Sequence, residues 1–425
     1  MTSIYIETYG CSLNFSDSER MAGLLKQAKF EIIENEEEAD IIIINTCTVK
    51  SPTESAFFTR LGELKQKYPY KIIIIAGCIA QTESQKLKGY PLIGTKEIQN
   101  VVSTVEEILH DNVTASVSTE NNPPLILPKI RKNPIIEIIP ISRGCLGYCS
   151  FCKTKSARGN LISYPIKEIK QQLEIALTQG VKEVWLTSQD CGCYGFDLNT
   201  DLAELLDELV KVPEDFKIRV GMMNPDHLLK IKDKLIKSYQ NPKIFKFLHL
   251  PVQSGNDDIL KAMNRKYTAE DFMQLVHELR MKVEDITIAT DIIVGFPGET
   301  ERQYWDTLFL VRKMIPDVVN ISRYWARPKT PAAKMKNQLP GEEIKRRSRV
   351  LAEIFNNISL LNHEKWKNWE GEILIDDQGK NNTLVGRNFA YKPVVLEENN
   401  NLKKGDIVKV KIKGYTTWDL RGEVN

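Results

Sequence analysis

The stretch "RGCLGYCSFCKTKSARG", residues 143–159, contains three cysteines with the spacing C-x3-C-x2-C and no histidine. These cysteines are Cys145, Cys149 and Cys152. Structural zinc sites close with four protein ligands, so three thiols alone do not complete one. A [4Fe–4S] cluster takes one thiolate per iron, and three cysteines therefore leave one iron open. An open iron can chelate a small molecule, which gives the odd number of cysteines a functional reason.

The length and composition of the chain indicate the kind of protein to which these cysteines belong. A chain of 425 residues with 42% hydrophobic and 27% charged residues is typical of a soluble globular protein with two or three domains. No apolar run is long enough to cross a bilayer, and the first residues lack the pattern of a signal peptide. We therefore expect a cytoplasmic protein, in which cysteines serve as ligands, catalytic groups or buried thiols more often than as disulfides.

The amino-terminal segment alternates strand and helix patterns. "IYIETYG", "ADIIIINTC" and "KIIIIAGC" predict strands, and helical patterns separate them. Continuous isoleucine runs indicate strands that are covered on both faces. Consecutive βαβ units of this kind predict an open parallel α/β sheet.

Three further cysteines each follow one of these strands. They are Cys11, Cys47 and Cys78. The carboxyl ends of parallel strands gather on one edge of a sheet, where such folds bind ligands. We therefore expect the three thiols to share one site, although three unrelated buried thiols are the simpler alternative.

The central segment predicts six strands with helical crossovers, which favours a partial or full (β/α) barrel with its active face at the carboxyl ends of the strands. The Cys145 cluster follows the first of them. The predicted strands are "IIEIIPIS", "EVWLTSQ", "KIRVGMM", "FKFLHLPVQ", "ITIATDIIVGF" and "VVNISRYWA".

From residue 361 short strands and turns replace long helices, which predicts a small antiparallel β-barrel. A polar, proline-containing stretch before the central segment indicates a linker. The fold class is therefore α/β with a β-barrel at the carboxyl terminus. The predicted domains are residues 1–110, a linker at 111–130, the barrel at 131–360 and the small β-barrel at 361–425.

These motifs together resemble a known family. "CLGYCSFC" after the first barrel strand resembles the radical S-adenosylmethionine (SAM) superfamily. "YGCSLNFSDSE", "NTCTVK", "AGCIAQ", "HLPVQSGNDDILKAMNRKYT", "TDIIVGFPGET" and "ARPKTPAAKM" resemble segments of methylthiotransferases, and the tail resembles an RNA-binding TRAM domain. "CKTK-ARG" and "RNFAYKPVV" are most similar to the archaeal and eukaryotic threonylcarbamoyladenosine tRNA methylthiotransferase branch.

This resemblance implies two [4Fe–4S] clusters and SAM as cofactors. Cys145, Cys149 and Cys152 would hold the cluster that binds SAM, and one electron would cleave SAM to a 5′-deoxyadenosyl radical. That radical would attack C2 of N6-threonylcarbamoyladenosine at tRNA position 37. Cys11, Cys47 and Cys78 would hold an auxiliary cluster that carries a methylsulfide, so the two triads should face each other across the domain junction.

The partner implied is a tRNA that carries N6-threonylcarbamoyladenosine. No motif names the electron donor or the sulfur source. Eukaryotic members often end in a hydrophobic membrane anchor, and the absence of one here favours a soluble, archaeal-type enzyme without a membrane partner.

Weaker candidates lie elsewhere on the predicted barrel. Phe151 occupies the position that usually packs near the cofactor in the resembling family. Gln189 and Asp190 end one barrel strand and are candidates for contact with SAM or substrate, with loop hydrogen bonding as the alternative, and they are the only catalytic candidates. Gln253 and Gly295 are further candidates for cofactor binding, with loop hydrogen bonding or a turn as the alternative.

Basic residues supply candidates for contact with substrate. Lys153, Lys155 and Arg158 follow the cysteine cluster, with a solvated basic face as the alternative. In the tail, small β-barrels bind nucleic acid with basic grooves and stacking rings. The candidate RNA-binding residues there are Arg387, Tyr391, Lys392, Lys411 and Lys413.

Several alternatives stay open. Cys191 and Cys193 form "DCGC" past a barrel strand, and we expect that they are not cluster ligands. The same enzyme class includes methylthiotransferases that act on isopentenyladenosine or on a ribosomal protein. An iron–sulfur electron-transfer protein and a zinc-organised RNA-binding adaptor are alternatives without this catalysis, and metal analysis would distinguish the zinc protein.

Overall fold

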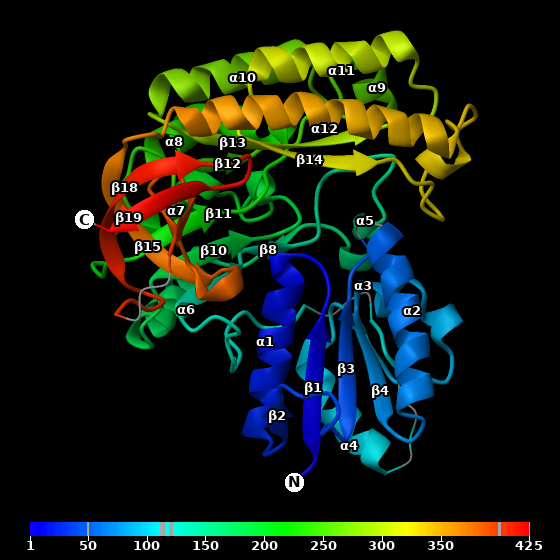
Figure 1. Cartoon of the computed structure of the whole chain (residues 1–425). Helices are drawn as coiled ribbons and strands as arrows, with labels where there is room; N and C mark the ends of the chain where they lie inside the picture. The colour runs from blue at the N-terminus through cyan, green and yellow to red at the C-terminus, as the bar shows by residue number, and fades with distance from the viewer. Residues whose placement is uncertain (49–50, 111, 113–114, 119–121, 398–400, 425) are drawn as a thin grey trace.

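The computed structural model describes residues 1–48, 51–110, 112, 115–118, 122–397 and 401–424. Part of the predicted linker at 111–130 lies outside the described residues. Figure 1 shows an α/β sheet domain at the amino terminus, a larger body of strands and helices above it, and a small β-barrel at the side of that body.

The amino-terminal domain is a six-stranded sheet in the order β2-β1-β3-β4-β5-β6, and every pair in it is parallel. Alternate residues of the isoleucine run in β3 point to opposite faces. Ile41 and Ile43 pack under α1 and α4, and Ile42 and Ile44 pack under α2 and α3. The strands are β1 (Ser3–Thr8), β2 (Glu31–Ile33), β3 (Ile41–Thr46), β4 (Ile72–Gly77), β5 (Leu92–Ile93) and β6 (Ala115–Ser116). The helices are α1 (Ser12–Gln27), α2 (Ser51–Lys67), α3 (Cys78–Thr82) and α4 (Val101–Leu109).

The predicted linker contributes to this domain. Its residues Ala115 and Ser116 form β6, which extends the sheet beyond β5. Leu125 of the same segment is 1% exposed and packs in the core of the central body. The segment between the two domains is therefore partly built into both.

The central body is a partial barrel of six parallel strands. β7, β10 and β11 form one sheet, β12, β13 and β14 form another, and a parallel bridge between Ile218 and Ile244 joins them. These are the six strands that the sequence predicts. The six strands are β7 (Ile136–Pro140), β10 (Glu183–Thr187), β11 (Lys217–Val220), β12 (Phe247–His249), β13 (Thr287–Val294) and β14 (Val318–Arg323). A separate antiparallel pair consists of β8 (Ser142–Arg143) and β9 (Ile162–Ser163).

Amphipathic helices cover the outside of these strands and close one large apolar core. α10 starts with a capping box in which Thr268 and Asp271 satisfy each other's backbone N–H groups, and α11 has the same arrangement. The helices are α5 (Thr154–Arg158), α6 (Ile166–Thr178), α7 (Leu202–Leu209), α8 (Pro225–Ser238), α9 (Asp257–Ala262), α10 (Ala269–Lys282), α11 (Glu301–Met314) and α12 (Gly341–Glu364).

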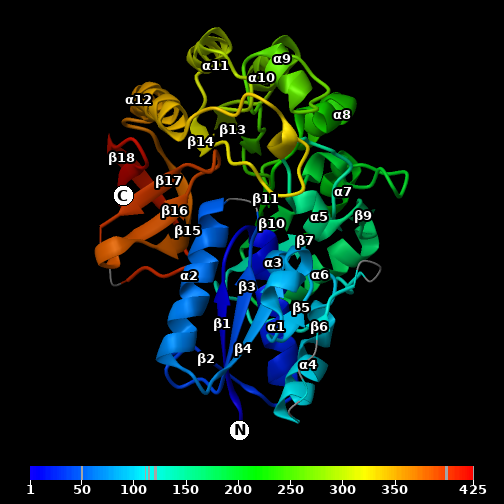
Figure 2. The same cartoon turned by 90° about the vertical axis from the view of Figure 1, so that its right-hand side faces the viewer.

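The long helix α12 leads into a closed five-stranded barrel with its own apolar core. Figure 2 shows this barrel below α12. One pair, β17 with β19, is parallel, whereas the sequence predicted an antiparallel barrel throughout. The strands are β15 (Glu370–Gln378), β16 (Leu384–Arg387), β17 (Pro393–Leu396), β18 (Ile407–Tyr415) and β19 (Leu420–Val424).

The sheet domain and the partial barrel meet at the carboxyl ends of their strands. The hydroxyls of Ser12, after β1, and Thr187, at the end of β10, are 2.6 Å apart. Arg327, after β14, donates to the Thr48 carbonyl at 2.7 Å and to Glu54 at 2.7 Å. The expectation that the two carboxyl edges face each other is therefore confirmed.

Candidate functional site

Three sulfurs gather at the carboxyl edge of the amino-terminal sheet. Cys11, Cys47 and Cys78 follow β1, β3 and β4, which are neighbours in the sheet. The sulfurs of Cys11 and Cys78 both lie 4.0 Å from Oδ1 of Asn14. The Asn14 amide donates to the carbonyls of Tyr9 and Thr46 at 2.8 Å, so it joins the ends of two strands.

Glycine at position 10 makes room for the third sulfur. Gly10 has a φ of 113°, a backbone conformation that favours glycine. A Cβ atom there would lie 2.5 Å from Cβ of Cys47 and 2.7 Å from its sulfur. Cys47 therefore packs directly on the residue before Cys11, and the three thiols share one site.

The second triad lies on the loop after β7 and β8. A Cβ atom on Gly147 would lie 3.4 Å from the sulfur of Cys145 and 3.8 Å from that of Cys149. The Gly147 N–H donates to the Cys145 sulfur at 3.2 Å, and Arg265 Nη1 donates to the Cys149 sulfur at 3.2 Å. Burial raises the pKa of the Cys149 thiol, and the Arg265 guanidinium opposes that shift. Cys152 follows in the same loop, and its N–H donates to the Cys149 carbonyl.

The junction between the two triads is charged and buried. Arg143 and Arg158 of the barrel donate to the two carboxylate oxygens of Asp17, each at 2.8 Å. Asp17 is 1% exposed and both arginines are 2% exposed. Burial would raise the pKa of Asp17, but the guanidiniums of Arg143 and Arg158 hold it below its usual value. The prediction that Arg158 contacts substrate is therefore wrong, because its side chain is fixed between the domains.

Asp190 does not have the catalytic position that the sequence predicted. One carboxylate oxygen accepts from the N–H groups of Gly192 and Asn224 at 2.9 Å, and the other lies 2.5 Å from Nδ1 of His227. The residue is 1% exposed, so these protein groups occupy its carboxylate. The prediction is corrected: Asp190 fixes the turn after β10.

Cys193 lies beside that pair, within hydrogen-bonding reach of Cys145. Its thiol donates to the Asp190 carbonyl at 3.3 Å. Hydrogen bonding from Cys193 lowers the pKa of the Cys145 thiol. Cys193 thus supports the position of Cys145, a role that the sequence did not indicate.

The cofactor candidates are placed around the same loop. The Gln189 side chain accepts from the N–H of Gly144 at 2.8 Å and so orients the turn before Cys145. Gln253 has a φ of 73°, and its buried side-chain oxygen has no hydrogen-bond partner within the described part of the chain. Phe151 packs against an apolar cluster that includes Phe296 and Tyr324.

Gly295 has a packing explanation. A Cβ atom there would lie 2.5 Å from Cγ1 of Ile344 on α12. Its N–H donates to Glu299 at 2.8 Å, and Glu299 forms a buried ion pair with Arg347. Glycine is therefore required where α12 approaches β13, which differs from the predicted role in cofactor binding.

The predicted RNA-binding residues divide into two groups. Tyr391 is buried, and its hydroxyl donates to Glu183 of β10 at 2.9 Å. Lys392 is buried and pairs with Asp317 at 2.6 Å. Arg387 pairs with Asp376 and lies over the Tyr391 ring. The prediction that Tyr391 and Lys392 bind RNA is wrong, because they attach the small barrel to the central one. Arg387 interacts within the small barrel, its side chain is 23% exposed, and its RNA contact stays a prediction.

The two lysines on the outer strands stay candidates. Lys411 pairs with Glu370 and Lys413 with Glu423, in ion pairs whose partners are at least a third exposed. Surface pairs of this kind are weak and leave the lysines available. Two exposed tryptophans, which were not predicted, are suited to stacking with bases. Trp418, between β18 and β19, is 70% exposed, and Trp325, just after β14, is 56% exposed.

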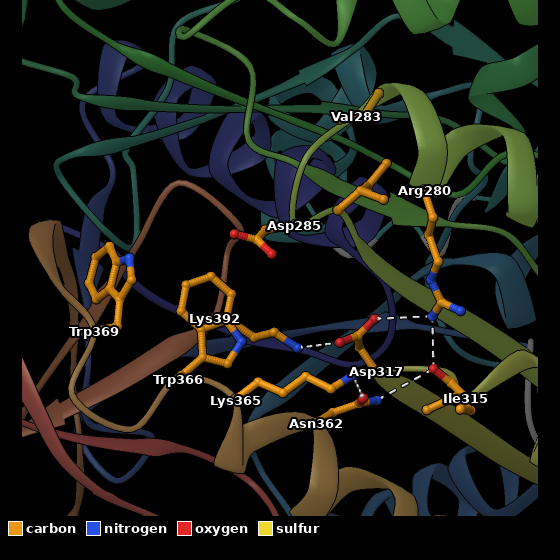
Figure 3. Close-up of a pocket in the computed structure, with 11 residues that line it drawn as sticks. Arg280, Val283, Asp285, Ile315, Asp317, Asn362, Lys365, Trp366, Trp369 and Lys392 are labelled. Carbon is orange, nitrogen blue, oxygen red and sulfur yellow. Dashed lines mark hydrogen bonds and ion pairs between the residues drawn. The ribbon is translucent and has the colours of Figure 1, made fainter.

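Figure 3 shows a cavity of about 360 Å³ between α12, the small barrel and the loops before β13 and β14. Arg280, Asp317, Lys392 and Trp366 line it, and Lys392 points at Asp317. Residues before β13 and β14 mark the amino ends of those strands. This cavity is therefore at the opposite end of the barrel from the cysteines and is not the site of their chemistry.

The fold and the site define a class: a radical SAM enzyme with a second cysteine site and a small carboxyl-terminal β-barrel. Family models match it in three parts, "Uncharacterized protein family UPF0004" at residues 3–93, "Radical SAM superfamily" at 139–311 and "TRAM domain" at 370–424. A solved radical SAM methyltransferase from Kitasatospora setae, with cobalamin and a [4Fe–4S] cluster bound, has a TM-score of 0.54 at 14% identity, over 78% of this chain and 77% of that one. That likeness shows the fold.

Closer relatives identify the family. "Probable threonylcarbamoyladenosine tRNA methylthiotransferase" of Pyrococcus abyssi is 42% identical over 100% of both chains. "Threonylcarbamoyladenosine tRNA methylthiotransferase" of Homo sapiens is 40% identical over 93% of this chain and 69% of its own. This chain belongs to the threonylcarbamoyladenosine tRNA methylthiotransferase family and is a transferase of the radical SAM type. None of the helices in the described part of the chain is long and apolar enough to cross a membrane.

The corrected role of Tyr391 leads to a testable prediction. Tyr391→Phe removes the hydrogen bond to the buried Glu183, whose pKa burial raises to about 7, and should destabilise the protein by about 1–3 kcal/mol. Chemical denaturation measures this change, and a filter-binding assay should show unchanged affinity for RNA. Tyr70→Phe, at a residue that is 97% exposed, is the matched control and should change neither quantity. Weakened RNA binding with unchanged stability would contradict the correction.

Proposed function

We propose that this protein converts N6-threonylcarbamoyladenosine at tRNA position 37 to its 2-methylthio derivative. The observation that carries the proposal is the pair of cysteine triads at facing carboxyl edges, with the Asp17–Arg143–Arg158 ion pairs between their domains. Two metal centres that face one junction can act on the same substrate. Membership of the family supports the choice of substrate.

The barrel triad fits the radical SAM cluster. The sulfurs of Cys145 and Cys149 lie beside Gly147, and the Gly147 N–H and Arg265 donate to these two sulfurs. Such donors stabilise the negative charge of thiolate ligands. Gln253 lies in the loop after β12, and its buried side-chain oxygen, which has no hydrogen-bond partner among the described residues, is a group that SAM would satisfy.

The second triad fits an auxiliary [4Fe–4S] cluster held by Cys11, Cys47 and Cys78. Its sulfurs share one site, and Cys11 is the N-cap residue of α1, where the helix dipole favours negative charge. Three protein thiolates again leave one iron open for a sulfur ligand.

When bound, SAM and the two clusters supply the hydrogen-atom abstraction and the sulfur transfer, which no side chain of this protein can perform. The side chains of the protein position these groups. Gln189 orients the loop of the barrel triad, and Asn14 joins the strand ends of the other. Lys411, Lys413 and the exposed ring of Trp418 are candidates to hold tRNA through phosphate contacts and stacking.

The substrate is tested by mass spectrometry of tRNA nucleosides from cells with and without the gene. The 2-methylthio-threonylcarbamoyladenosine peak should disappear in the deletion, and threonylcarbamoyladenosine should accumulate. Complementation with the intact gene is the control. A deletion that leaves this peak unchanged, or that removes a methylthiolated isopentenyladenosine instead, would refute the proposed substrate.

The division of labour between the triads is tested with two triple variants. Anaerobic reconstitution should give about eight irons per chain for the intact protein and about four for either variant, because each triad holds one four-iron cluster. Cys145, Cys149 and Cys152→Ala should abolish formation of 5′-deoxyadenosine from SAM. Cys11, Cys47 and Cys78→Ala should keep that reaction and stop methylthiolation.

Two results would contradict this division. One is the loss of deoxyadenosine formation in both variants while each retains four irons. The other is zinc without iron in the reconstituted intact protein, which would favour the adaptor without catalysis.

A further inference from the structure

Arg158 reaches from the barrel into the sulfur site of the other domain. It ends the short helix α5, which follows the Cys145 loop, and it is 2% exposed. Its Nη1 donates to Asp17 at 2.8 Å and its Nη2 donates to Asn14 Oδ1 at 2.7 Å. Asn14 Oδ1 is the atom that also lies 4.0 Å from the sulfurs of Cys11 and Cys78. The guanidinium therefore stands beside the amino-terminal triad.

The described residues of this junction include more buried positive side chains than negative ones. Among the described residues, Arg20, Arg143 and Arg158 are all at most 2% exposed, and the carboxylate of Asp17 forms ion pairs with two of them, Arg143 and Arg158. Three buried cations against one anion would be costly without further negative charge nearby. Deprotonated cysteines around a cluster supply such charge.

One nitrogen of Arg158 also lacks an acceptor. Among the described residues, Nε of Arg158 is buried and has no hydrogen-bond partner. Buried N–H groups are almost always paired in native structures. An N–H without an acceptor, on a side chain that already contacts the sulfur site, indicates an acceptor that belongs to a bound group.

We propose that Arg158 is a positioning residue for the auxiliary cluster, supplied across the junction by the domain that holds the other cluster. Its buried positive charge compensates the negative charge of the thiolate-bound cluster and so raises the reduction potential of that cluster. Because α5 directly follows the loop of the barrel triad, the same segment supports both metal sites. This inference rests on the proposed function, in which Cys11, Cys47 and Cys78 hold the cluster.

The test uses the full-length protein in which Cys145, Cys149 and Cys152 are replaced by Ala, so that only the auxiliary cluster is present. Arg158→Gln and Arg158→Lys are reconstituted anaerobically. Iron and sulfide are counted, and the midpoint potential is measured by redox titration followed by electron paramagnetic resonance (EPR). Arg158→Gln should shift the potential to a lower value, and Arg158→Lys, which keeps the charge, should shift it less.

Arg327→Gln is the matched control. Arg327 is another buried guanidinium that crosses the same junction, but it donates to Thr48 and Glu54. Although Thr48 follows Cys47, the charge of Arg327 is paired with Glu54 at 2.7 Å, so its replacement should shift the potential of the auxiliary cluster less than Arg158→Gln does. The barrel cluster, measured in the background without Cys11, Cys47 and Cys78, should keep its potential when Arg158 is replaced.

Each outcome separates the inference from the function on which it rests. Loss of the auxiliary cluster in Arg158→Gln, with retention in Arg158→Lys and in Arg327→Gln, would also support the role of Arg158. Full iron content with an unchanged potential in Arg158→Gln would overturn that role and leave the proposed function standing. Absence of iron in the background with intact Arg158 would overturn the auxiliary cluster itself.

Discussion

Asp17 is the group on which the relation of the two domains depends. It lies on α1, and its two oxygens accept from Arg143 and Arg158 of the barrel in a buried junction. Removing one partner of a buried ion pair leaves an uncompensated charge and typically costs about 3–5 kcal/mol. The two domains therefore cannot shift along the junction without breaking these ion pairs. Because it joins the segment after Cys11 to the segment around Cys152, it also fixes how the two sulfur sites face each other.

The sites themselves were largely predictable because backbone geometry places them. A cysteine that follows each of three parallel strands must lie on one sheet edge, and Cys11, Cys47 and Cys78 do so on adjacent strands. The isoleucine run of β3 predicted a strand that is buried on both faces, and helices cover both faces. Patterns of this kind depend on residues that are close in the sequence, so they can be recognised from the sequence alone.

Side chains whose role depends on tertiary contacts were less predictable. Tyrosine and lysine are common on RNA-binding surfaces, but in this structure Tyr391 contacts Glu183 and Lys392 contacts Asp317. The sequence made Arg158 a candidate for contact with the substrate or the cofactor carboxylate, with a solvated basic face as the alternative, since nothing in the local sequence places Asp17 beside it. Sequence patterns give the type of a charge, whereas burial and partner decide what that charge does.

The central claim is that the two triads hold metal centres that face one junction and act on one substrate. EPR spectra of the fully reduced, reconstituted protein test this most directly, because nearby paramagnetic clusters interact magnetically. The account predicts a spectrum broadened by spin–spin interaction, which differs from the sum of the spectra of the two proteins that each lack one triad. A spectrum equal to that sum, from a protein with both clusters loaded and reduced, would contradict it.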